Sequence, residues 1–306
     1  MHYRFFLLLF HVKLPYARLS ASAAVLALAA ACSPLGQQPA PAPTSSQSAN
    51  ATATRDDNLA LGNPSGATTD ASTSANNYLL RKSQYVMSYN RSQGKPNWVS
   101  WHLSSAWLGS TARQDNFAPD NALPSGWYRA GASSYSGSGF DRGHNCPSAD
   151  RTGSVADNSA TFLMSNMMPQ ASTNNQQTWA GLENYCRTLV DAGNELYIIC
   201  GSYGRGGTGT NGSAFTIDNG NVTVPSNCWK VVVVLPVGSS DVSRITGSTR
   251  VIAINTPNTT AISSDWGSYR TTVDAIEAAT GYDLLSAVAT SVQSTIEARK
   301  DTGPTK

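Results

Sequence analysis

Three short runs of apolar residues in the second half of the chain have the pattern of β-strands. They cover residues 195–200, 229–235 and 250–254, they are rich in Val and Ile, and Gly, Asn and Pro bound them. Runs of this length and composition indicate strands. A fourth segment, residues 98–103, alternates apolar and polar positions, which is typical of a strand with one apolar and one polar face.

The strongest helical pattern in the chain covers residues 174–192. Its apolar residues, Trp179 and Leu182 among them, recur at three- and four-residue spacings, and Gly193 marks its end. A second helical stretch begins near residue 273. Together with the strands, these helices predict an α+β fold, with a central antiparallel sheet flanked by helices.

The four residues Asp141-Arg142-Gly143-His144 bring a carboxylate, a cation and a candidate general base into one tight turn. Alone, this tetrapeptide is a weak signal, because a histidine in a turn is often structural. Its neighbourhood strengthens it, since an Asn- and Gln-rich segment leads into the predicted helix over residues 174–192. The combination predicts a phosphodiesterase site that uses one metal ion.

Three polar residues of that helix, Asn175, Glu183 and Arg187, are separated by multiples of four. They therefore lie along one side of the helix, and their side chains lean toward its N-terminus. At about 1.5 Å per residue, Glu183 lies about 12 Å along the axis from Asn175. That is too far to share a metal ion directly but close enough to act through bound water; the alternative is a solvated helix face.

The histidine content limits the choice of metal. Of the four histidines, His2 and His11 lie in an N-terminal segment with the pattern of a leader. His102 lies on the polar face of the alternating strand, where we interpret it as structural, so His144 stands alone. A zinc site built on several imidazoles is hard to assemble, and Mg²⁺ or Mn²⁺ with oxygen ligands fits better.

From about residue 61 to about 297, the chain resembles the DNA/RNA non-specific endonucleases with a ββα-metal (His-Me finger) site. Within that family it is most similar to the secreted sugar-non-specific nucleases of cyanobacteria. The Asp-Arg-Gly-His motif, with an Asn and a Glu spaced as here, is specific to the family. Further segments that carry the resemblance are residues 61–66, 113–120, 135–140 and 280–283.

The resemblance implies a role for each candidate residue. His144 would be the general base that takes a proton from the attacking water, which requires a neutral imidazole. Asn175 would be the only direct protein ligand of the metal ion. Glu183 would orient metal-bound water, and Asp141 would be a further anion near the ion. Arg113 would contact the scissile phosphate, where charge accumulates in the transition state.

The resemblance also implies supporting residues, substrates and partners. Arg142 and Arg187 would help to position the substrate, and Asn166 would have a supporting role. DNA and RNA, single or double stranded, would all be cleaved to products with 5′-phosphates, because the chemistry does not use the 2′-hydroxyl. The family includes members with dedicated protein inhibitors.

The charge balance argues that phosphate binding is local. The chain has 21 Lys plus Arg against 19 Asp plus Glu, and Arg4, Lys13 and Arg18 precede Cys32, which leaves 18 against 19 afterwards. A protein near electroneutrality has no general attraction for polyanions. A few arginines in one cleft must therefore supply the affinity for phosphate.

The N-terminus has the pattern of an export signal, with basic residues before a short alanine-rich apolar stretch. Residues 1–32 are predicted to be a signal peptide, residues 33–60 a disordered tether rich in Pro, Ala, Ser and Thr, and residues 61–306 the nuclease domain. Cleavage after Ala31 would secrete the protein, whereas a lipid on Cys32 would anchor it to a membrane in the periplasm or at the cell surface.

Four cysteines follow Cys32, and an exported protein can form disulfides. Four cysteines allow three pairings. Because Cys200 ends one predicted strand and Cys228 begins the next, we expect these two to pair. Cys146 and Cys186 would then form the second bond, or remain free.

Two other functions fit the sequence. A phosphodiesterase that acts on a non-nucleic substrate would keep the same metal site. An inactive surface lipoprotein with the nuclease fold would account for the tether, although it would be expected to lose His144 or Asn175, and both are present.

Overall fold

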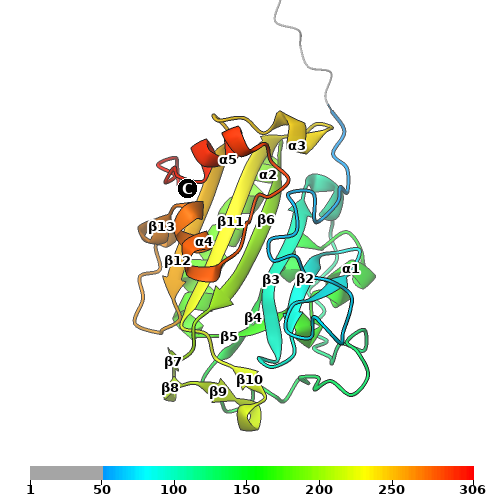
Figure 1. Cartoon of the computed structure of the whole chain (residues 1–306), viewed down its shortest axis with the longest axis vertical. Coiled ribbons are helices and arrows are strands. Elements are labelled where there is room, and N and C mark those ends of the chain that lie inside the picture. Colours follow the sequence, from blue (N-terminus) through cyan, green and yellow to red (C-terminus); the bar gives the residue numbers. More distant parts are fainter. Residues whose placement is uncertain (1–50) are drawn as a thin grey trace, which may run out of the picture. The chain divides into compact units, whose positions relative to one another are not determined.

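The computed structural model describes residues 51–306, and its central feature is a seven-stranded sheet in which all neighbouring strands are antiparallel (Figure 1). The strand order is β1-β2-β3-β6-β11-β12-β13. The strands are β1 (Tyr78–Arg81), β2 (Val86–Asn90), β3 (Lys95–Leu103), β6 (Asn194–Tyr203), β11 (Asn227–Pro236), β12 (Arg250–Pro257) and β13 (Arg270–Thr271). The four strands expected from the sequence correspond to β3, β6, β11 and β12, and they form the centre of the sheet.

Both faces of the sheet are covered by apolar cores, which explains the apolar run over residues 231–235 of β11. Val232 packs into one core together with Trp179 and Leu182 of the helical segment over residues 174–191. Val231 packs into the other core together with Ile276. Successive side chains of a strand point to opposite faces, so one uninterrupted run supplies both cores.

The helices divide between the two faces. A π-helical turn, Asn174–Trp179, continues into α2 (Ala180–Asp191) on the first face, and α4 (Val273–Thr280) and α5 (Thr290–Ile296) cover the second (Figure 1). The predicted α+β fold is confirmed. The expected helix over residues 174–192 is present, but its first six residues are π-helical, so the α-helical spacing assumed between Asn175 and Glu183 does not hold there.

The remaining elements are short. β4 (Asp141–His144) pairs with β5 (Met167–Gln170), β7 (Gly207–Gly209) with β8 (Gly212–Ala214), and β9 (Thr216–Ile217) with β10 (Val222–Thr223). Two further helices are α1 (Val155–Ala160) and α3 (Asp241–Arg244). The β4–β5 pair and the π-helical turn together make the ββα unit that the sequence predicted.

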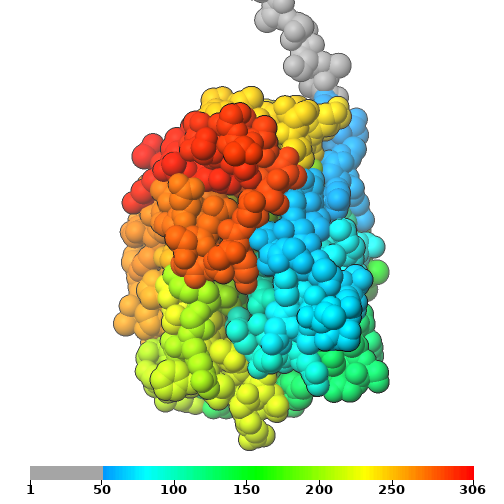
Figure 2. Space-filling view, in the orientation of Figure 1, coloured from blue at the N-terminus to red at the C-terminus, as the bar shows by residue number. Residues whose placement is uncertain are grey.

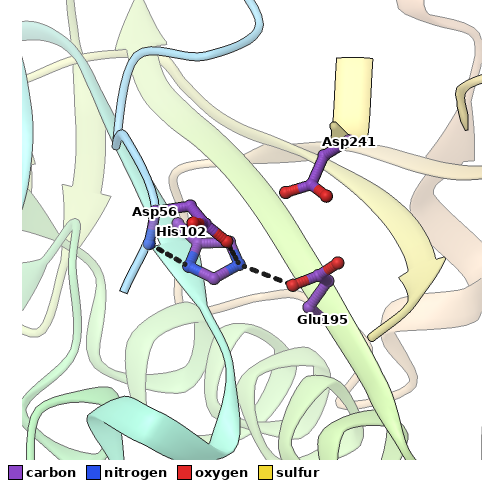
Figure 3. Close-up of side chains that lie close together, drawn as sticks. All are labelled: Asp56, His102, Glu195 and Asp241. Atoms are coloured by element: carbon purple, nitrogen blue, oxygen red, sulfur yellow. Dashed lines mark hydrogen bonds and ion pairs between the residues drawn. The ribbon is translucent and has the colours of Figure 1, made fainter. Parts of the chain in front are cut away.

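His102 does not lie on an exposed polar face, as the strand pattern predicted, because its side chain is fully buried. Its Nδ1 accepts the backbone N–H of Asp56 at 3.3 Å, and its Nε2 lies 3.3 Å from Glu195 Oε2 (Figure 3). Arg244 pairs with both Glu195 and Asp241. The Arg244 guanidinium thus already supplies a positive charge to the buried cluster of His102, Glu195 and Asp241.

The expected disulfide between Cys200 and Cys228 is absent, as is the one between Cys146 and Cys186. All four residues are buried free thiols. In the register of β6 and β11, Cys200 lies opposite Lys230 and Cys228 lies opposite Ser202. The two cysteines are therefore diagonal neighbours on one face. Residues in this relation lie about 7–8 Å apart, with their Cβ atoms somewhat closer, whereas a disulfide needs Cβ atoms about 3.8 Å apart.

Residues 54–58, which the sequence assigned to the tether, make hydrogen bonds with the nuclease body. Arg55 pairs with Asp157 at 3.1 Å, and Asn58 donates to the carbonyl of Ser83 at 2.8 Å. The packed part of the chain therefore begins before residue 61. No helix within residues 51–306 has the length and apolar character needed to cross a membrane. The expected signal peptide and Cys32 lie outside the described residues.

Candidate active site

The Asp-Arg-Gly-His motif forms β4, and its pairing with β5 fixes the direction of each side chain. Asp141 lies opposite Gln170 and His144 lies opposite Met167. Gly143 is required by close packing, because a Cβ atom at this position would lie 2.7 Å from Cβ of Gln170. The motif is therefore a rigid strand rather than the turn that the sequence suggested.

Asn175, in the π-helical turn, contacts the first residue of the motif. Its Nδ2 donates to Asp141 Oδ2 at 2.9 Å, and Gln176 Nε2 donates to the same oxygen at 2.8 Å. A carboxylate only accepts hydrogen bonds, so the amide nitrogen of Asn175 must face Asp141. This leaves Asn175 Oδ1 free to act as a ligand.

His144 is buried between two aromatic rings. The imidazole centroid lies 5.7 Å from that of Phe117 and 5.1 Å from that of Phe162, and the residue is 9% exposed. Nε2 is buried and has no hydrogen-bond partner among residues 51–306. The Arg142 backbone acts on the ring by raising its pKa, as a hydrogen-bond acceptor does. A neutral imidazole has one protonated nitrogen and one nitrogen with a lone pair, so the ring can accept a proton.

The surroundings of His144 favour its neutral form. Burial lowers the pKa of His144 from 6.5 to about 3, and the positive charges of Arg113 and Arg142 contribute, while the hydrogen bond to the Arg142 backbone opposes the change. The imidazole is therefore an available proton acceptor throughout the neutral range.

Two of the predicted arginines lie next to this histidine. Arg142 stacks over Phe117 with its Cζ 3.9 Å from the ring centroid, and Arg113 stacks over Phe162 at 4.8 Å. Arg113 also donates to Asp115 Oδ1 at 2.7 Å. Both arginines line a cleft of about 300 Å³ that also includes Asp141 and Asn175.

Glu183 and Arg187 do not line this cleft. Glu183 Oε1 lies 3.2 Å from the Nζ of Lys230, which is 1% exposed, and Arg187 pairs with Asp150 at 2.8 Å. Burial raises the pKa of Glu183, and the ammonium of Lys230 opposes that effect. These two residues form separate ion pairs, each between α2 and another part of the fold.

Sequence reasoning missed Lys230. The pattern around Lys230 predicts a strand, but a lysine inside the apolar run Trp229–Leu235 also indicates a buried charge. A buried ammonium is costly unless it is paired, so such a lysine indicates a partner carboxylate. Lys230 also lies 4.1 Å from the ring centroid of Trp179, which adds a cation–π contact.

Asn166 is fully buried and supports the loop that follows β4. Its Oδ1 accepts the N–H of Cys146 at 3.0 Å, and its Nδ2 donates to the carbonyl oxygens of Cys146 and Thr161. All of its polar atoms are used in this way. Asn166 therefore holds the end of the motif and does not reach the cleft.

Over most of its length the chain matches one known protein family. The profile of the DNA/RNA non-specific endonucleases matches residues 63–291. The chain belongs to this family. It is accordingly a nuclease, a hydrolytic enzyme that acts on nucleic acids, as the resemblance implied.

Individual relatives of this endonuclease agree with the assignment. The chain is 50% identical over 279 residues to a nuclease of Nostoc sp. (strain PCC 7120 / SAG 25.82 / UTEX 2576). The matched residues are 91% of this chain and 96% of the relative. It is 35% identical over 192 residues to a nuclease of Syncephalastrum racemosum, covering 58% and 57% of the two chains.

A solved structure supports the fold of the endonuclease. A chain in the crystal structure of the EndoG/EndoGI complex has a TM-score of 0.63 and 24% sequence identity, and the match covers 79% of this chain and 96% of that one. At this identity the likeness concerns the fold alone.

Proposed function

We propose that the endonuclease cleaves DNA and RNA, single or double stranded, at the cleft of Arg113, Asp141, Arg142 and Asn175, leaving 5′-phosphates. The observation that carries this proposal is the neutral His144 with an unpartnered Nε2, next to two arginines. A proton acceptor and phosphate-binding cations are the groups that phosphodiester hydrolysis requires.

In this proposal His144 Nε2 takes a proton from water as the water attacks phosphorus in line with the leaving oxygen. Arg113 and Arg142 bind the non-bridging oxygens, on which negative charge increases in the transition state. Nε2 is buried in the structure, so water reaches it only after a local side-chain displacement. Phe117 is the best candidate to move, because it is only half-buried and lines the cleft.

We propose Mg²⁺ or Mn²⁺ as the metal ion. The residues at the cleft fit such an ion, because Asn175 Oδ1 is free and the Asp141 carboxylate lies beside it. Both are hard oxygen donors, which these ions prefer. Asn175 would bind the ion and Asp141 would hold water on it. When bound, the ion would stabilise negative charge on the phosphate and the leaving oxygen.

The positions of Glu183 and Arg187 limit their proposed roles. The Lys230 ammonium and α2 hold the Glu183 carboxylate in place, so it can act on the cleft only through water. Arg187, paired with Asp150, positions α2 and is not proposed to contact the substrate.

We further propose that the enzyme is exported and is either secreted or held at a membrane by a lipid on Cys32. The leader pattern of residues 1–32 supports this proposal. A dedicated protein inhibitor is also proposed, since the structure with a similar fold is that of the EndoG/EndoGI complex, in which EndoG is inhibited.

Digestion of supercoiled plasmid and of single-stranded RNA tests the proposed function. Both should be cleaved with Mg²⁺ or Mn²⁺ and neither with EDTA, and the products should carry 5′-phosphates. Cleavage of a small phosphodiester but of neither polymer would favour a non-nucleic substrate. No hydrolysis of any of them would favour the inactive surface protein.

Arg113→Ala is expected to lower kcat by about 10²–10³-fold, the scale of losing one transition-state donor. Arg113→Lys should recover little, because an ammonium does not reproduce a planar two-pronged donor. The control is Arg81→Ala, which removes an exposed arginine on the edge strand β1. We would measure kcat and KM on a short duplex at two salt concentrations. A normal kcat with only a raised, salt-sensitive KM would place Arg113 at the binding rim.

A further inference from the structure

Three carboxylates meet where α4 packs against the end of α5. Asp274 and Glu277 lie three residues apart on α4, and Glu297 directly follows α5. One oxygen of each carboxylate lies within 4.8 Å of one oxygen of each of the others. The backbone N–H of Asp274 also donates to the carbonyl of Glu297 at 3.2 Å. Figure 2 shows these segments, in orange to red, lying together on one surface of the protein.

Glu297 is the buried member of this cluster. The residue is 7% exposed, and its Oε1 is buried without a hydrogen-bond partner in the described part of the chain. Burying a polar group without a partner costs folding free energy, and burying a charged one costs more. The fold therefore brings an uncompensated carboxylate toward two others.

No basic side chain within residues 51–306 forms an ion pair with any of the three carboxylates. Arg299 is near in sequence, but it donates to the carbonyls of Gly247 and Thr249. Burial, together with the charges of Glu277, Asp274 and Asp283, raises the pKa of Glu297 to about 7. Apart from the Leu284 N–H, which donates to Glu277 Oε1 at 2.7 Å, a proton or a bound cation is needed to offset this concentration of negative charge.

We propose that Asp274, Glu277 and Glu297 form a binding site for a divalent cation with oxygen ligands, Ca²⁺ above all. Ca²⁺ accepts several carboxylates in flexible geometry at about 2.3–2.6 Å, whereas Mg²⁺ demands a near-ideal octahedron and keeps its water. The ion would join α4 to the end of α5. The site shares no residue with the catalytic cleft, so it does not depend on the proposed mechanism.

The buried cluster around His102 is the contrasting case. There the Arg244 guanidinium bridges Glu195 and Asp241, and the Tyr197 hydroxyl donates to Asp241. Its charges already have partners within the chain. Within residues 51–306, the carboxylates of Asp274, Glu277 and Glu297 have no such cation. For this reason their cluster is assigned to a metal ion and the cluster around His102 is not.

Calorimetric titration of the full chain with CaCl₂, after removal of metals with EDTA, tests the site. The titration uses Asn175→Ala as background, so that the catalytic cleft does not contribute. This protein should bind one Ca²⁺, and adding Glu297→Gln or Glu277→Gln should weaken binding at least about tenfold, since a ligand charge is lost. Adding Asp191→Asn, which removes an exposed carboxylate at the end of α2, should leave binding unchanged.

Thermal unfolding supplies a second readout, because a ligand that binds only the folded state raises its stability. Ca²⁺ should raise the melting temperature of the Asn175→Ala protein and of its Asp191→Asn derivative, but not of the Glu297→Gln derivative. Equal shifts in all three would overturn the proposal. A second outcome would also overturn it: the Glu297→Gln derivative is more stable than its parent, and Ca²⁺ stabilises neither protein. Glu297 would then carry a proton instead of binding a metal ion.

Discussion

Replacing His144 with alanine is expected to lower kcat on plasmid DNA by about 10²–10⁴-fold, the usual contribution of a general base to the rate. The structure supports this expectation, because Nε2 is unpartnered and burial holds the pKa of the imidazole at about 3, far below the neutral range. Initial cleavage rates with saturating Mg²⁺ measure the effect.

Two controls separate proton transfer from folding at this position. Circular dichroism and Mn²⁺ titration should show that His144→Ala keeps the fold and the metal affinity, since His144 is not a proposed ligand. His144→Asn should be similarly inactive although it fills part of the space between Phe117 and Phe162. A His144→Ala enzyme that cuts plasmid at more than about a tenth of the wild-type rate would exclude the general-base role.

Asn175→Ala is expected to be nearly inactive and to lose most of its Mn²⁺ affinity at the cleft. Asn175 Oδ1 is the free amide oxygen beside Asp141, so removing it leaves no direct protein ligand there in the proposed site. Asn175→Asp should not restore activity, because a second carboxylate would replace the 2.9 Å hydrogen bond with a repulsive contact to Asp141. Calorimetric titration with Mn²⁺ and plasmid cleavage measure the two effects.

Gln176→Ala is the matched control for Asn175. Gln176 is exposed and donates to the same oxygen of Asp141 at 2.8 Å, but it does not line the cleft. Its loss should reduce activity much less than the loss of Asn175. Unchanged Mn²⁺ affinity in Asn175→Ala would remove Asn175 from the metal site.

The sequence determined the elements whose signal is local. Apolar runs of Val and Ile were enough to predict β6, β11 and β12, and helical spacing was enough for α2 and for the helices after residue 273. Short-range patterns of this kind depend on the chain's own period and not on what covers it. The motif Asp141–His144, followed by Asn175, indicated the site differently, through its resemblance to a known family.

Only the tertiary structure decided the features that depend on which distant residues become neighbours. The register of β6 and β11 placed Cys200 and Cys228 diagonally, so they cannot form the expected disulfide. The packing of α2 on the sheet paired Glu183 with Lys230 rather than exposing it to the cleft. Register, burial and ion pairing are set by contacts across the fold, and a single sequence pattern carries no measure of them.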